Sequence, residues 1–391
     1  MSTISYKNKM KKRIISVFLA VCMILTMATA CSTNEPINAE PDESAKPDES
    51  AEQKPDEEQE QEPEDISKTV IFTDSTGREV EVPSDITKIA PSGPLAQIVL
   101  FAIAPEMMVG LATEWNPGDE QYIAADYYNL PVLGQFYGKG ELNLEEVVRV
   151  APQIIIDIGE AKSTIVEDMD GIQKQLNIPT VHIDAATSTM GEAYRILGDL
   201  LGKKEEAEAI AKYCDDVYKN TQDIMAKVGE DGKAKLIYSL GEDGLNVLAK
   251  GAFQAEIIDM VSNNIAVVED ISSKGTGNPV DMEQLILWDP DIILFEPGSA
   301  YSIAGDSVTW QQLKAIKNGN YYEVPMGPYN WIGSPPSVNR YMGMIWSTQL
   351  LYPEHAQYNL YEETAKYYKI FYHCDLTQEQ YEELVADSIL K

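Results

Sequence analysis

The chain has 391 residues, which is enough for two domains that each bury a hydrophobic core. Its formal net charge is −33; the basic amino terminus contributes +5 and an acidic segment after it −12, so the remainder carries −26. This charge argues against nucleic acid or an anionic membrane surface as the ligand of the folded part, because both would repel it.

The first thirty residues have the composition of a secretory signal. Five basic side chains precede an apolar run over residues 14–28, which is too short for a transmembrane helix. Cys31 follows the small residues Ala28, Thr29 and Ala30, an arrangement that resembles a bacterial lipobox, whose cysteine is lipidated and becomes the mature amino terminus. The lipobox usually has Leu at the position of Ala28, so an ordinary cleaved signal or an uncleaved anchor is the alternative.

Residues 32–66 form an acidic segment with 14 Asp and Glu against two Lys, and the sequence PDES occurs twice in it. Large apolar side chains are almost absent, so the segment cannot bury enough surface to offset the conformational entropy of its chain. We predict a disordered spacer that extends by self-repulsion and tethers the folded part.

After the spacer, the hydrophobic pattern predicts a hairpin over residues 70–82 and then alternating strands and helices. Strands are expected at residues 86–90, 109–112 and 180–183, and helices at residues 95–103, 167–176 and 190–201. A polar and aromatic segment over residues 122–129 fits either a loop or a helix.

Two stretches in this pattern repeat each other without a gap at an offset of 138 residues. Residues 143–157 read NLEEVVRVAPQIIID and residues 281–295 read DMEQLILWDPDIILF, with Glu145 aligned to Glu283. In both, apolar residues at helical spacing are followed by a proline, which ends a helix. A short apolar run typical of a buried parallel strand comes next. Chance similarity is the alternative, but the spacing exceeds a solenoid unit of about 20–50 residues and favours two duplicated lobes.

Residues 203–228 lie between the two repeats and predict one long helix, because their pattern is helical and contains neither Gly nor Pro. Beyond it, strands are expected at residues 235–240 and 321–324, and helices at residues 253–261, 310–316, 341–351 and 358–390. The predicted fold class is α/β, with two similar lobes that carry mainly parallel sheets and are joined by one long α-helix.

Motifs that carry chemistry are sparse. The three histidines, His182, His355 and His373, have no metal-binding spacing, and no nucleophile-elbow, phosphate-loop or dinucleotide-binding motif occurs. We therefore predict no enzyme, no catalytic residue, no metal site and no cofactor. Cys214 and Cys374 either form a disulfide or remain two partly buried thiols.

Together, the signal, Cys31, the acidic tether, the twin lobes and the long helix resemble a class III substrate-binding protein of an ABC importer, the cobalamin and ferric-siderophore type. The resemblance implies a signal peptide over residues 1–30, a lipidated cysteine with its tether over 31–66, an N-terminal lobe over 67–202, an interlobe helix over 203–228 and a C-terminal lobe over 229–391. It also implies a ligand cleft between the lobes and a lipid anchor on the extracytoplasmic face of the cell membrane.

In that family each repeat carries a glutamate that docks onto arginines of the permease, and the aligned positions here are Glu145 and Glu283. Two exposed carboxylates at a set separation suit charge-assisted contacts with guanidinium groups. For either glutamate alone, the alternative is an early helix carboxylate that the helix dipole favours. The implied partners are an ABC permease dimer and its ATPase, with the binding protein itself a monomer.

The family binds its ligand at loops after strand ends, where open α/β sheets bind ligands. Carried over by position, the ligand-binding residues are Ser92, Gly93, Phe136, Tyr137, Glu160, Glu296, Tyr329, Trp331 and Arg340. The aromatic members suit an apolar chelate and the arginine suits an anionic complex. For any single aromatic residue, packing in the core is the alternative.

The predicted function is capture of a metal chelate outside the membrane and its delivery to the permease, without hydrolysis. A ferric siderophore is the first expectation, followed by cobalamin or haem and then by an oxyanion such as molybdate. The rivals of another class are an exported metal-dependent enzyme that uses the cleft and a domain that signals to a membrane sensor. The membrane is contacted only through the palmitate-type lipid anchor, and nucleic acid is not bound.

Overall fold

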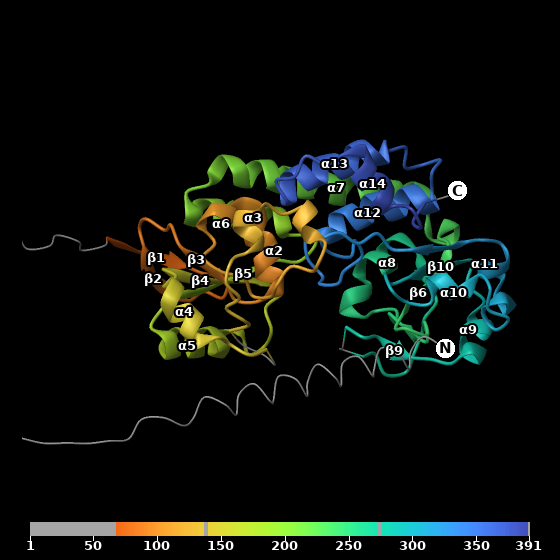
Figure 1. The fold of residues 1–391 in the computed structure, drawn as a ribbon, viewed down its shortest axis with the longest axis horizontal. Coiled ribbons are helices and arrows are strands. Elements are labelled where there is room, and N and C mark those ends of the chain that lie inside the picture. Colours follow the sequence, from red (N-terminus) through yellow and green to blue (C-terminus); the bar gives the residue numbers. More distant parts are fainter. Residues whose placement is uncertain (1–67, 137–139, 273–274, 390–391) are drawn as a thin grey trace, which may run out of the picture. The chain divides into compact units, whose positions relative to one another are not determined.

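Two main sheets, one in each lobe, organise the described part of the chain, and the first lobe also has a two-stranded sheet (Figure 1). The computed structural model describes residues 68–136, 140–272 and 275–389. Both lobes belong to one unit, Asp65–Lys391. We call the part built around the three-stranded sheet the first lobe and the part built around the six-stranded sheet the second lobe.

The first lobe starts with an antiparallel hairpin of β1 (Thr69–Thr73) and β2 (Glu79–Pro83). Its main sheet is parallel throughout and has the order β3 (Ile89–Pro91), β4 (Ile154–Gly159), β5 (Thr180–Asp184). The isoleucines of β4 are buried, as expected for a strand that is covered on both faces. The helices of this lobe are α2 (Pro94–Ile103), α3 (Ala125–Tyr128), α4 (Leu144–Val150), α5 (Ile165–Leu176) and α6 (Met190–Leu201).

The second lobe has the strand order β11-β10-β6-β7-β9, with β8 on the flank of β6. The strands are β6 (Lys235–Leu240), β7 (Asn246–Val247), β8 (Asn263–Asn264), β9 (Asn278–Pro279), β10 (Ile292–Phe295) and β11 (Tyr321–Glu323). Strand β10 runs parallel to both β6 and β11, while β7 and β9 pair antiparallel at the edge. The helices are α8 (Glu256–Val261), α9 (Met282–Trp288), α10 (Tyr301–Ala304), α11 (Lys314–Lys317), α12 (Asn339–Leu351), α13 (Leu360–Phe371) and α14 (Gln378–Leu384).

The predicted long helix is confirmed as α7 (Lys204–Val228), which has 25 residues. At 1.5 Å per residue its length is about 38 Å. It ends at Gly229, whose φ of 68° a residue with a side chain adopts less readily. Helix α12 packs against α7 and against α13, and Figure 1 shows these helices together on one side of the lobes.

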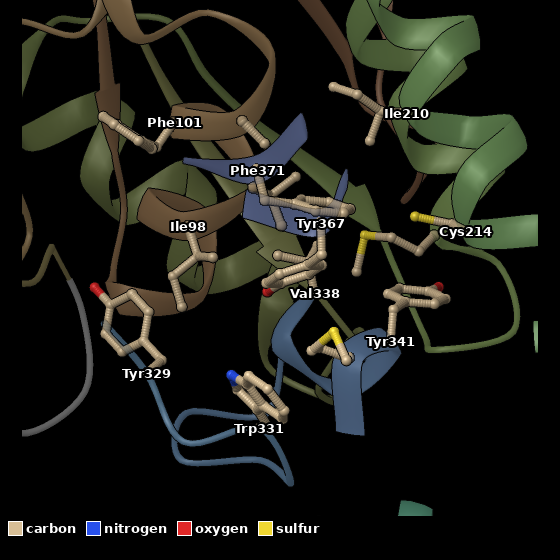
Figure 2. Packing of buried hydrophobic residues seen from close by; sticks show 14 of the residues in the cluster. Ile98, Phe101, Ile210, Cys214, Tyr329, Trp331, Val338, Tyr341, Tyr367 and Phe371 are labelled. Atoms are coloured by element: carbon tan, nitrogen blue, oxygen red, sulfur yellow. The ribbon is translucent and has the colours of Figure 1, made fainter. Parts of the chain in front are cut away.

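The lobes also share one hydrophobic core through these helices. Ile98 and Phe101 of α2 belong to the same buried cluster as Tyr341 of α12, and Tyr367 and Phe371 of α13 lie between them (Figure 2). The two rings of α13 are 4.7 Å apart. Separating the lobes here would expose apolar surface to water, which costs about 25 cal/mol of free energy for each Å² exposed. The lobes are therefore held by this packing as well as by α7.

Several segments differ from the expectation. Residues 109–112 form no continuous strand: the Val109 N–H donates to Ile89 of β3 beside the Met108–Ile89 bridge, and Leu111 forms an isolated bridge to Val132. The predicted helical tail divides into α13 and α14, since Thr377 starts a new helix with a capping box. Residues 310–316 form a 3-10 turn followed by the short α11.

Cys214 and Cys374 are free thiols in the structure. Burial raises the pKa of both, most strongly for the fully buried Cys214. The predicted signal, Cys31 and the tether lie outside the described residues. Among the helices that the structure describes, none combines the length and apolar character of a membrane span.

Candidate functional site

A cavity of about 600 Å³ lies between the lobes. The first lobe lines it with residues 92–96, 135 and 157–162, and the other side is lined by Phe253, Gln254 and Pro336. Residues 92–96 follow β3 and residues 157–162 span the carboxyl end of β4. These two strand ends share one edge because the strands are parallel. Strand topology therefore places this cavity at the cleft between the lobes.

The amino terminus of α2 faces this cavity. Gly93 occupies the N-cap position and no side chain caps the helix, while Leu95 and Ala96 of the first turn line the cavity. Uncapped N–H groups at the positive end of a helix dipole favour a negatively charged group. Lys162 lines the same cavity and adds positive charge. These groups suit an anionic ligand, whereas the carboxylate of Glu160 in the same lining opposes one.

A buried polar network lies at the first-lobe side of the cavity. The Ser92 hydroxyl donates to Asp157 Oδ1, and His182 Nδ1 lies 2.7 Å from Asp157 Oδ2. All three side chains are almost fully buried. Among the described residues His182 Nε2 has no hydrogen-bond partner. Because Ser92 donates to a carboxylate rather than to a ring nitrogen, the network positions Ser92 and does not provide the base that activates a serine nucleophile.

A second polar cluster joins the lobes behind the cavity wall. The Thr187 hydroxyl of the first lobe donates to Glu256 Oε2 of α8 at 2.6 Å. Arg340 at the start of α12 donates to Glu256, to Thr187 Oγ1 at 3.1 Å and to the carbonyl of Phe253 at 2.6 Å. The Arg340 guanidinium also stacks on the Phe253 ring at 4.9 Å, and burial lowers its pKa. This clamp positions Phe253, which lines the cavity.

The structure brings three of the predicted ligand-binding residues, Ser92, Gly93 and Glu160, to the cavity surface. Arg340 is 3% exposed and lies behind Phe253 rather than on that surface. A contact of any of these residues with ligand stays a prediction.

The remaining predicted residues lie elsewhere. Trp331 is 1% exposed and packs edge-on against Trp346, and Figure 2 shows it in the core. Tyr329 is also buried, with its hydroxyl 3.3 Å from Gln97 Nε2. Phe136 packs in a small core cluster within the first lobe.

Glu296 follows β10 as expected, and burial raises the pKa of its half-buried carboxyl, but it is not among the residues that line the cavity. Tyr137 lies outside the described residues.

Sequence reasoning missed Asp157, Lys162 and Phe253. Asp157 carried a usable signal, because it interrupts an otherwise apolar buried strand at the position where the second repeat has Phe295. A buried carboxylate is unfavourable unless its hydrogen bonds are satisfied, which marks the position as special. Phe253 carried no such signal, because its exposure at the cavity and its contact with Arg340 become visible only in the structure.

Another cavity of about 340 Å³ lies between the loop at residues 116–122 and the carboxyl-terminal segment at residues 383–388. Four carboxylates line it, those of Asp119, Glu323, Glu383 and Asp387. Within the described residues, no three His, Cys, Asp or Glu side chains are grouped to hold a metal ion. Burial raises the pKa of Asp119 to about 6, while the N–H of Asn116, at 2.8 Å, opposes the shift.

We expect Asp119→Asn to raise the free energy of unfolding at about pH 7.5 by about 2 kcal/mol. Between about pH 4 and 6 the folded protein keeps a proton that the unfolded chain has released, so stability falls as pH rises through 6. Asparagine keeps the acceptor for Asn116 and carries no charge, so this fall should be absent from urea unfolding curves of the variant. Asp126→Asn, at an exposed position, is the control, and an unchanged pH dependence in Asp119→Asn would contradict the expectation.

The two sequence repeats form matching structures. Helices α4 and α9 each have seven residues and an N-cap side chain that accepts from the third helical N–H, that of Asn143 at 3.2 Å and that of Asp281 at 2.8 Å. Glu145 and Glu283 occupy the same position in the first turn, and both are exposed. Figure 1 shows α4 and α9 on the side of each lobe opposite α7 and α12.

A profile of the periplasmic binding protein family matches residues 120–326, which is more than half of the chain. The chain belongs to the periplasmic binding protein family. The Fe(3+)-citrate-binding protein YfmC of Bacillus subtilis is 25% identical over 193 residues, covering 47% of this chain and 57% of the relative. A putative ABC transporter substrate-binding lipoprotein of that organism, YhfQ, is 21% identical over 199 residues, covering 48% and 60%. The chain thus spans less than two thirds of these relatives.

Solved structures extend the likeness to most of the folded chain of this periplasmic binding protein. An ABC transporter solute binding protein from Sulfurospirillum deleyianum has a TM-score of 0.74 and 25% identity, covering 81% of this chain and 99% of that one. The molybdate-binding protein MolA of Haemophilus influenzae has a TM-score of 0.62 at 18% identity, covering 79% and 99%, and shows the fold alone.

These matches confirm the predicted resemblance to class III binding proteins and the two-lobed α/β fold. The named relatives are solute-binding proteins rather than enzymes, and the family is extracytoplasmic.

Proposed function

We propose that this periplasmic binding protein captures a small solute between its lobes and delivers it to an ABC permease driven by an ATPase. The observation that carries the proposal is the cavity of about 600 Å³ that both lobes line, in a chain with this family's fold. Its volume is in the range of sites for small molecules. The shared core of α2, α12 and α13 supports a small closure on binding, because a wide opening would expose that core.

The proposed ligand is an anionic ferric complex, either a ferric siderophore or ferric citrate. A relative named as a Fe(3+)-citrate-binding protein supports iron. The α2 amino terminus and Lys162 at the cavity support negative charge on the ligand, and Phe253 offers an apolar wall for a chelate. Cobalamin, haem and an oxyanion are the competing ligands in the binding test below.

Glu145 and Glu283 are the proposed contacts with the permease, and Cys31 is the proposed lipid anchor that holds the protein at the extracytoplasmic face of the membrane. Their support is the duplicated placement of the glutamates on α4 and α9 and the signal-like segment before Cys31. The proposed boundaries of the lobes are those of the sequence, at residues 202 and 229 on either side of α7.

We expect Glu145→Ala combined with Glu283→Ala to lower the uptake of radioactive iron from ferric citrate at least about tenfold, since each buried charge contact is worth about 2 kcal/mol or more. Calorimetric affinity for ferric citrate should stay unchanged, because neither side chain is among the residues that line the cavity. The control is Glu205→Ala combined with Glu362→Ala, which removes the same charge from the first turns of α7 and α13. This control should leave uptake intact.

Normal uptake by the glutamate variant would remove the docking role. If the unchanged protein binds cobalamin, haem or molybdate but not a ferric complex, the fold-level function stands and the proposed ligand is wrong.

A further inference from the structure

The two repeat helices carry an unusual share of the exposed apolar side chains. Helices α4 and α9 hold 14 residues, under one in twenty of those described, yet four of the 14 exposed large hydrophobic side chains lie on them. These four are Leu144, Val148, Ile286 and Leu287. A single exposed apolar residue is ordinary, but its recurrence on both copies of a duplicated helix points to a shared use.

On each helix the apolar side chains lie beside the glutamate. Val148 follows Glu145 by three residues and Ile286 follows Glu283 by three, so each pair shares one face of its helix. Leu287, four residues after Glu283, widens the second patch. Val148 is 77% exposed and Leu287 is 78% exposed.

Both helices are fixed in the orientation that exposes these side chains. One fully buried residue anchors the inner face of each, Val147 on α4 and Leu285 on α9. Each helix ends at a residue other than glycine with φ of 46°, Ala151 and Asp289, directly before the proline. Residues other than glycine adopt this left-handed conformation uncommonly. Its occurrence at the carboxyl ends of both α4 and α9 shows that the two helices are copies of one structure.

We propose that Leu144, Val148, Ile286 and Leu287 form, with the neighbouring glutamates, one mixed docking surface for the extracytoplasmic face of the permease. This rests on the proposed function. The surface is acidic and apolar, because Arg149 is the one basic residue in the two helices and it is paired with Glu146. A complementary partner presents a basic side chain beside an apolar depression, and presents it twice because the surface is duplicated.

The apolar and charged parts have different physical roles. Opposite charges attract the partner at a distance and orient it, and salt weakens that attraction. Burial of the apolar side chains holds the complex afterwards and slows dissociation, as at interfaces where a few buried residues carry most of the binding energy.

Photo-crosslinking in intact cells tests the surface without knowledge of the ligand. Benzoyl-phenylalanine at position 148 or 287 is expected to give adducts with one polytopic membrane protein, in at least about tenfold higher yield than at position 308. Val308 is the matched control, since it is 86% exposed and lies outside both helices. Equal yields at all three positions, or no adduct at 148 and 287, would overturn the proposal.

A second measurement separates this inference from the proposed function. With the crosslinker at position 287, Val148→Lys is expected to lower the adduct yield about tenfold while the melting temperature stays unchanged. If Glu145→Ala with Glu283→Ala abolishes the adduct and Val148→Lys does not affect it, the apolar surface is wrong and glutamate docking stands. If only Val148→Lys lowers the yield, the apolar surface stands and docking through the glutamates is wrong.

Discussion

Glu256→Gln should lower the free energy of unfolding by about 3 kcal/mol, because it leaves the buried Arg340 guanidinium without its counter-charge. Arg340 is 3% exposed and the Glu256 side chain is 33% exposed, so water can replace the carboxylate only in part. Glutamine keeps the shape and the acceptor oxygen while it removes the charge. The clamp to Thr187 joins the lobes, so the loss should appear as a single shift of the whole chemical unfolding transition.

Glu208→Gln is the matched control for this prediction. Glu208 also pairs with an arginine, Arg195 at 2.8 Å, but its side chain is 59% exposed, and exposed pairs contribute about 0–1 kcal/mol. Equal losses in the two variants would show that the clamp is no more than a surface ion pair. Because Arg340 supports Phe253 at the cavity wall, Glu256→Gln should also weaken binding of the ligand, whereas Glu208→Gln should not.

Gly343→Ala should destabilise the fold by at least about 3 kcal/mol or prevent folding. Gly343 lies inside α12, and a Cβ atom there would stand 2.1 Å from the carbonyl oxygen of Trp331. A main-chain atom cannot move aside as a flexible side chain can, so α12 or the segment around Trp331 would have to shift within the shared core.

Gly171→Ala in α5 gives the opposite expectation under the same chemical change. Apart from the adjoining residues and the backbone of α5 itself, no atom lies within 4 Å of a Cβ at Gly171, and alanine favours a helix over glycine by about 0.5–1 kcal/mol. Thermal and urea unfolding should therefore show a lower stability for Gly343→Ala and a higher stability for Gly171→Ala than for the unchanged protein. A stable Gly343→Ala protein would show that α12 and the Trp331 segment are not in close contact.

The elements that sequence reasoning predicted well depend on local pattern. Helices α4 and α9 are set by their caps, Asn143 and Asp281, by apolar spacing and by the proline that follows each. The long helix α7 follows from the same kind of information, because a run without Gly or Pro needs no distant partner to be recognised. The predicted strand at residues 109–112 is reduced to isolated contacts with Ile89 and Val132, because a strand needs consecutive pairing that local pattern does not specify.

For the candidate site, the residues that depend on strand topology were predictable, and those that depend on packing were not. Parallel strands end at one edge, so loop positions such as Ser92, Gly93 and Glu160 were predictable as cavity residues. Tyr329 and Trp331 were expected at the cleft, yet the structure buries both, because the approach of α12 decides which aromatic side chains are covered.

By itself the sequence determined the duplication, the class of fold and the place of the glutamates, since each is written in spacing along the chain. Only the tertiary structure decided which polar groups meet across the lobes. Arg340 contacts Thr187, 153 residues earlier in the chain, and Thr187 donates to Glu256, 69 residues later. Such contacts depend on how the two lobes pack together, and the spacing of residues along the chain does not specify that packing.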